Sequence, residues 1–219
     1  MKKVTIFATL AAALIFSAFT GNINKDTAIT EITATTGPAK AKAYTVLLEK
    51  SEIKWNAKKV TGEHFGKVNL KSGQMLIAKN KVTGGTFVID MSSLTVDDIK
   101  DEKMNGKLTG HLKSDDFFST DKHSTATFVV TSVKPLAKAE AGKPNYTVTG
   151  NLTLKGITNP ITFPAVITVQ DGIANAVADI TIDRTKFDIR YRSSNFFEDL
   201  GDKAIYDDFT ISLNVSAKQ

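Results

Sequence analysis

Hydrophobic and polar residues alternate along most of the chain from Tyr44 onward, and this period of two constrains the fold more than any other feature. The stretch 209–215 shows it well, with Phe209, Ile211, Leu213 and Val215 separated by Thr210, Ser212 and Asn214. Similar alternation occurs at 53–58, 86–91, 146–154 and 161–169. Successive side chains of a β-strand point to opposite faces, so each segment has one apolar and one polar face. The sequence therefore predicts an all-β protein.

The connections between these segments indicate antiparallel pairing. Shorter strand-like stretches at 44–49, 67–78, 125–133 and 173–182 complete a set of about eight, and turn residues separate them. Asp171-Gly172 between two alternating runs is typical of a tight hairpin. Buried parallel strands would instead be continuously apolar. Eight such strands predict a sandwich or a barrel, and a closed barrel has no exposed sheet edge.

One region departs from the alternation. Between Thr95 and Leu112 the residues Met104, Leu108 and Leu112 follow a four-residue spacing, with aspartates near the start. This favours an amphipathic helix, although Gly106 and Gly110 lower its intrinsic stability. We expect this helix to form a short cap that packs on the barrel.

The first residues resemble an export signal. Lys2 and Lys3 precede an apolar run over 4–19, so we interpret 1–21 as a signal peptide, 22–43 as a flexible linker and 44–219 as the domain. An uncleaved membrane anchor is the alternative. We expect a periplasmic or secreted protein with no stable membrane insertion once the signal is cleaved.

Composition excludes several function classes. The chain has no cysteine, so it has no disulfide, thiolate metal site, cysteine nucleophile or lipid-modified cysteine. Its net charge is +5, but most of that excess precedes residue 44. The nearly balanced domain argues against binding to nucleic acid.

No catalytic constellation is recognisable. His64, His111 and His123 have neither HxH nor HExxH spacing, and no Gly-x-Ser-x-Gly or phosphate-binding loop is present. Adjacent carboxylates on a strand face opposite ways, and the acidic loop 198–202 lacks the ligand pattern of a calcium site. We expect no metal, no cofactor and no enzyme activity. An enzyme acting on a lipophilic substrate stays an alternative.

The three arginines are close together in the sequence, whereas lysines occur throughout. Arg184, Arg190 and Arg192 either pair with nearby aspartates or meet the polar head group of a ligand. The second reading assigns the head-group role to Arg190 and Arg192, at the mouth of the barrel.

Large apolar side chains either fill a solid core or surround a ligand, because eight-stranded barrels of both kinds exist. A solid structural or adhesion module is therefore an alternative to a binding protein. The binding hypothesis assigns these residues to the wall of an apolar channel: Trp55, Phe65, Phe87, Met91, Met104, Leu108, Leu112, Phe117, Phe118, Phe128, Phe187 and Phe196.

Three segments resemble a known family: GHLKSDDFFSTDKHSTATF (110–128), YTVTGNLTLKGITNPITF (146–163) and DRTKFDIRY (183–191). They are similar to motifs of the YceI-like family of periplasmic, lipocalin-like proteins, and the resemblance covers 44–217. It implies an extended eight-stranded antiparallel barrel with an internal apolar channel and a short helical cap. It also implies a bound lipid that the protein carries or sequesters: a polyisoprenoid, an isoprenoid quinone or a fatty-acid derivative. A homodimer stays open.

The chain departs from the family pattern at several positions. Lys50 and Lys59 stand where histidines are frequent, and Asp188 stands where a glycine is common. The loop 192–208 is also divergent. These departures leave the identity of the ligand open.

Overall fold

The computed structural model describes residues 41–219, so the expected signal peptide and residues 22–40 of the expected linker lie outside the described part. The strands are β1 (Lys42–Val46), β2 (Glu52–Lys59), β3 (Gly62–Ala78), β4 (Lys81–Asp90), β5 (Thr125–Pro135), β6 (Tyr146–Leu154), β7 (Ile157–Gln170), β8 (Ile173–Asp183) and β9 (Ile205–Lys218). The helices are α1 (Glu102–Lys113) and the short 3₁₀ turns η1 (Leu48–Lys50), η2 (Met91–Ser93), η3 (Arg184–Phe187) and η4 (Gly201–Lys203).

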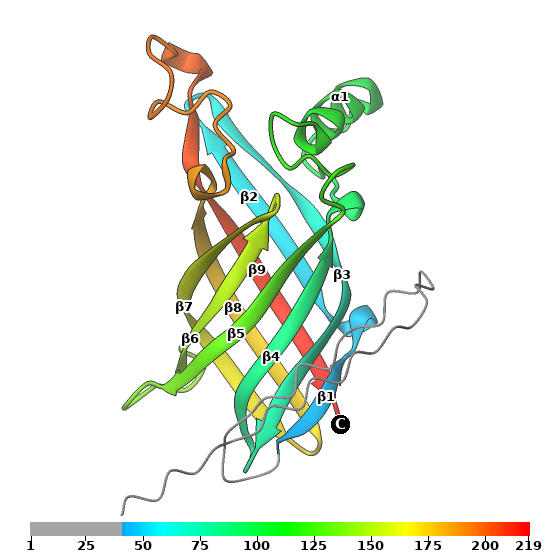
Figure 1. Ribbon diagram of the computed structural model, residues 1–219, viewed down its shortest axis with the longest axis vertical. Helices are drawn as coiled ribbons and strands as arrows, with labels where there is room; N and C mark the ends of the chain where they lie inside the picture. Colours follow the sequence, from blue (N-terminus) through cyan, green and yellow to red (C-terminus); the bar gives the residue numbers. More distant parts are fainter. Residues whose placement is uncertain (1–40) are drawn as a thin grey trace, which may run out of the picture. The chain divides into compact units, whose positions relative to one another are not determined.

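The strands form one closed antiparallel barrel (Figure 1). They are ordered β3-β2-β9-β8-β7-β6-β5-β4, and pairing of β4 with β3 closes the ring. The predicted eight-stranded antiparallel barrel is confirmed. The ninth strand does not add a position to the ring, because β1 continues the line of β2. β1 pairs with the far parts of β3 and β9, and η1 separates it from β2.

The pairing between β7 and β8 covers only part of β7. Val166–Gln170 pairs with Ile173–Val177 of β8, whereas the N-terminal part of β7 pairs with β6 alone. Pro160 and Pro164 lie in this part of β7. Proline has no N–H to donate, so it favours strand edges. η3 bridges this region, since Asn159 Nδ2 donates to the carbonyl of Lys186 at 2.8 Å.

The cap differs from its prediction in where the helix begins. α1 starts at Glu102 because the Asp101 carboxylate accepts a hydrogen bond from Met104 N at 2.8 Å, an N-cap arrangement. The preceding segment is not helical. It runs along β3 instead, with Thr95 N donating to Lys67 O and Asp97 N donating to Phe65 O. The helix therefore occupies only the later part of the region 95–112 in which it was predicted, because the backbone at Thr95 and Asp97 pairs with the open edge of β3.

Across residues 41–219 no helix has both the length and the apolar character needed to cross a membrane.

Candidate ligand-binding cavity

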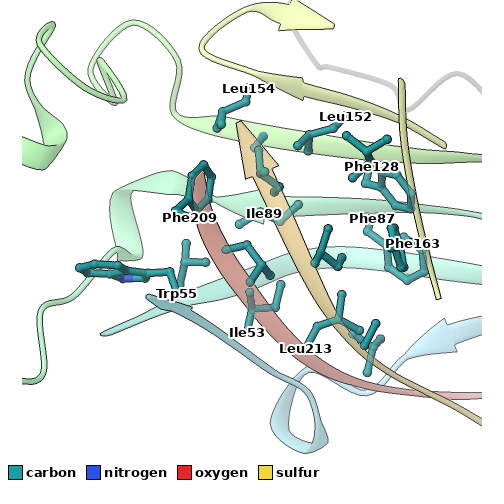
Figure 2. A pocket seen from close by; sticks show the side chains of 18 of the residues that line it. Ile53, Trp55, Phe87, Ile89, Phe128, Leu152, Leu154, Phe163, Phe209 and Leu213 are labelled. Atoms are coloured by element: carbon teal, nitrogen blue, oxygen red, sulfur yellow. The ribbon is translucent and has the colours of Figure 1, made fainter. Parts of the chain in front are cut away.

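The barrel encloses a cavity of about 220 Å³ whose wall is formed by the inward-facing residues of β2–β9 together with the cap. Figure 2 shows 18 of these side chains and labels ten, with Trp55 at one side and Phe87, Phe128 and Phe163 at the other. Among the described residues, the wall is aliphatic, aromatic, methionine or glycine except for Arg184, and Tyr206 adds one phenolic hydroxyl. The interior is thus a cavity rather than a solid core.

Glycines let the phenylalanine rings lie close to the barrel wall. Gly150 of β6 is beside the Phe128 ring, and a Cβ at Gly150 would overlap that ring. A Cβ at Gly73 or Gly85 would lie 3.0 Å or 3.2 Å from Phe87. The two rings stack with centroids 6.5 Å apart. Because glycine has no side chain, each ring occupies space next to the backbone, and the lumen stays wider than the number of aromatic residues suggests.

Seven of the twelve predicted channel residues line the cavity: Trp55, Phe87, Met91, Leu112, Phe117, Phe118 and Phe128. The other five do not. Phe187 is almost fully buried but lies outside the wall, and Leu108 packs against the core from α1.

Phe65, Met104 and Phe196 are 44%, 63% and 45% exposed, so their placement differs from the prediction. Phe65 is in the outward phase of β3, where Gly66 and Val68 point inward. Met104 is on the solvent side of α1. Phe196 lies in the loop before β9, next to Arg190.

The two arginines predicted to meet a ligand head group lie outside the cavity wall. Arg190 is exposed, with Nε 2.6 Å from Asp188 Oδ1, and its guanidinium lies 4.8 Å above the Phe196 ring. Arg192 lies over the ring of Tyr191, at 5.2 Å. Both therefore have local partners on the loop beside the mouth.

Arg184, to which the sequence analysis gave no ligand role, is the buried arginine of the wall. Its Nε donates to Tyr206 O at 3.1 Å, and its Nη2 donates to Ile205 O at 3.0 Å. Its Nη1 donates to the carbonyls of Ile189 and Tyr191 at 2.9 and 3.0 Å.

The ion pair of Arg184 completes this network. Nη2 lies 3.0 Å from Asp207 Oδ1, and the side chains are 5% and 20% exposed. Burial lowers the pKa of the Arg184 guanidinium, and the neighbouring carboxylates of Asp207 and Asp183 oppose that shift. An arginine has five N–H donors. Four of them donate to backbone carbonyls here, and Nη2 also forms an ion pair with Asp207 without a hydrogen bond to its Oδ1. Arg184 thus ties η3 and the following loop to β9.

An aromatic cluster joins the cap to the loop after η3. The His111 ring at the end of α1 packs against Phe117 and Tyr191, with centroids 5.0 and 4.7 Å apart. His111 Nε2 also lies 2.8 Å from Asp116 Oδ2. Leu112 and Phe117 line the cavity, so this cluster joins the cap, the wall and the loop after η3.

A polar contact holds the segment before α1. Asp98 Oδ2 lies 2.7 Å from His64 Nδ1, and Asp98 Oδ1 accepts a hydrogen bond from Phe65 N at 3.1 Å. Burial raises the pKa of Asp98, but the hydrogen bonds from His64 and Phe65 outweigh it, and the net pKa lies below the ordinary value of 3.8.

We expect Asp98→Asn to lower the melting temperature by a few degrees near neutral pH, because hydrogen bonds to a charged group contribute about 1.5–3 kcal/mol. A carboxyl group whose pKa is lower in the folded than in the unfolded protein stabilises the fold fully at pH values above its unfolded-state pKa. This stabilisation is lost as the pH falls through the folded-state pKa. The difference between the two proteins should therefore shrink as the pH falls below about 4. Thermal melts at a series of pH values test this; a pH-independent difference would contradict it.

The molecule is therefore a small closed antiparallel β-barrel with an apolar lumen and a helical cap at one end. The model of the YceI-like domain matches residues 44–217, and the chain belongs to the YceI-like family.

Individual relatives are more distant. A UPF0312 protein of Shewanella denitrificans is 34% identical over 100 residues, which cover 46% of this chain and 47% of that protein. A UPF0312 protein of Pseudomonas fluorescens is 46% identical over 55 residues, covering 25% and 28% of the two chains. The matches thus span about half, or less, of the length of these curated relatives.

Two solved structures share the fold. BcnA of Burkholderia cenocepacia has a TM-score of 0.58 and 23% identity, covering 79% of this chain and 99% of its own. A polyisoprenoid binding domain of Saccharophagus degradans, implicated in plant cell wall breakdown, has a TM-score of 0.54 and 16% identity, covering 80% and 97%. At these identities the likeness concerns the fold alone.

Proposed function

We propose that this protein binds a long-chain apolar lipid, with the hydrocarbon inside the barrel, and carries or sequesters it in the periplasm or outside the cell. A polyisoprenoid is the ligand class that we favour, and binding rather than catalysis is the proposed activity. The export signal expected at the N-terminus supports the compartment.

The observation that carries the proposal is that the few polar groups of the described cavity wall have protein partners or lie at its exposed end. The Trp55 Nε1 donates to Thr95 O at 3.0 Å, Arg184 donates to four backbone carbonyls and pairs with Asp207, and Tyr206 is 53% exposed. A polar ligand group placed inside would lose its hydrogen bonds to water without replacement, which costs about 1–3 kcal/mol or more. The chemistry of the wall therefore selects hydrocarbon inside the barrel and leaves a polar end group at the mouth.

The size of the cavity favours a slender occupant. A cavity of roughly 150 Å³ accommodates one benzene molecule, and common ligand pockets have about 300–1,000 Å³. The 220 Å³ here lies between these values. A volume in this range leaves little room for a bulky ligand, and a long chain or a linear probe would require wall side chains to move. The chain belongs to the YceI-like family, and a polyisoprenoid binding domain is among its own structural neighbours, which supports this choice.

Diphenylhexatriene, a linear all-hydrocarbon probe, tests the proposal. Trp55 is the chain's one tryptophan and lines the cavity, so we expect energy transfer from Trp55 to the bound probe. We also expect the polyprenol octaprenol to displace the probe competitively. Probe fluorescence without transfer from Trp55 would indicate binding elsewhere, and an absence of both signals would contradict the proposal. Mass spectrometry of an organic extract of the purified protein would identify a native ligand.

A further inference from the structure

Exposed large hydrophobic side chains gather at the end of the barrel where the cap lies. Figure 1 shows α1, the β2–β3 turn and the loop between η3 and β9 together at this end. The exposed residues there are Val60, Phe65, Met104, Phe196, Phe197 and Tyr206. We call this set the apolar rim. Scattered exposed hydrophobic residues are ordinary, but a group around one opening indicates an interaction surface.

The loop before β9 is the most exposed aromatic part of the rim. Phe196 and Phe197 are consecutive and 45% and 49% exposed, and Arg190 lies over the Phe196 ring. The loop itself is anchored, because Phe196 N and Phe197 N both donate to Ser193 O, and the buried Ser193 Oγ donates to Asp207. An aromatic pair beside an arginine on a fixed loop suits the interface between lipid head groups and acyl chains.

The charge around the rim indicates which kind of membrane it fits. Segments 58–65, 100–107 and 188–208 carry the basic residues Lys58, Lys59, Lys100, Lys103, Lys107, Arg190, Arg192 and Lys203, and the acidic residues Glu63, Asp101, Glu102, Asp188, Glu198, Asp199, Asp202, Asp207 and Asp208. The two signs nearly cancel. Binding to anionic lipid needs an excess of positive charge. A balanced rim instead fits a zwitterionic surface that it enters through apolar contacts.

We propose that the apolar rim docks on a zwitterionic phospholipid bilayer, with the mouth of the barrel facing the membrane. The inference rests on the proposed function, because a hydrocarbon ligand has almost no free concentration in water and must be exchanged directly with an apolar phase. Tyr206 of the rim lines the cavity and is also 53% exposed, so the cavity wall reaches the surface at this end. If the rim docks on the bilayer, the ligand can move between the membrane and the barrel without passing through water.

Single fluorescent labels can report which end of the barrel meets the bilayer. The chain has no cysteine, so Ser194→Cys and Glu140→Cys each accept one nitrobenzoxadiazole label. Ser194 is exposed beside Phe196, whereas Glu140 lies in the β5–β6 connection at the opposite end. With phosphatidylcholine vesicles we expect a blue shift and a several-fold intensity gain at position 194 and no change at 140. The N-terminal segment is common to both proteins, so it does not produce this difference.

Phe196→Ser/Phe197→Ser in the Ser194→Cys protein should lower vesicle partitioning by about tenfold or more, because two partly buried aromatic side chains are lost. Moderate salt should have little effect. The proposal would be overturned if the fluorescence of the label at 194 did not change, or if both labels changed equally. It would also be overturned if the protein bound only phosphatidylglycerol vesicles, in a salt-sensitive manner. Diphenylhexatriene binding without vesicles separates the two failures, since Phe196 and Phe197 lie outside the cavity wall.

Discussion

Replacing Arg184 with methionine is expected to lower the free energy of unfolding by about 3–5 kcal/mol, because it leaves the Asp207 carboxylate without its buried cation. The carbonyls of Ile189, Tyr191, Ile205 and Tyr206 also lose their donor. For a domain of this size each kcal/mol corresponds to about 2–4 °C, so the melting temperature should fall by roughly 10 °C. Lysine should restore little, since its three donors cannot reproduce the planar guanidinium.

Arg190→Met is the matched control for this prediction. Arg190 pairs with Asp188 on the surface, and exposed ion pairs contribute about 0–1 kcal/mol. Its melting temperature should stay within a few degrees of the parent protein. Calorimetric melts of both variants test this prediction. Similar decreases in melting temperature for the two would show that the Arg184 network does not stabilise the attachment of η3 and the following loop to β9.

The architecture was accessible from the sequence because it depends on local pattern. Alternation with a period of two fixes which side chains point inward, and short turns such as Asp171-Gly172 leave antiparallel pairing as the simplest arrangement. The same pattern contained a signal that the sequence analysis did not use. Ile180 and Ile182 of β8 point inward, and Arg184, directly after the strand, continues this alternation. A charged residue at an inward-facing position indicates a buried group that has bonding partners.

The cavity could not be predicted from the amino-acid composition. Its width depends on which residue faces each phenylalanine, and Phe128 meets Gly150 only through the register of β5 against β6. The errors at Phe65 and Met104 have a related origin, since the sequence shows that a side chain is apolar but not that it faces a neighbour. Which neighbour a side chain meets depends on long-range pairing, such as that of Thr95 and Asp97 with β3 beside Phe65.

Filling the lumen should abolish probe binding while leaving the barrel folded. Ala126 of β5 and Ala178 of β8 both line the cavity, so Ala126→Phe/Ala178→Phe introduces two phenyl groups into about 220 Å³. One benzene molecule already requires roughly 150 Å³. We expect diphenylhexatriene affinity to fall by tenfold or more, because admission of the probe then demands overpacking of about 1–3 kcal/mol per ring.

Two rings overfill about 220 Å³ by this measure, so the melting temperature should fall by several degrees. The barrel should stay folded, because most of the added volume enters existing space. Thr181→Phe, on the exposed face of β8, adds a ring outside the barrel and should leave probe binding unchanged. The measurement is a fluorescence titration of the three proteins with energy transfer from Trp55. If the double variant kept full affinity, the probe would have to bind outside the lumen, whereas a collapse of its melting temperature would mean that the interior has no room for added side chains.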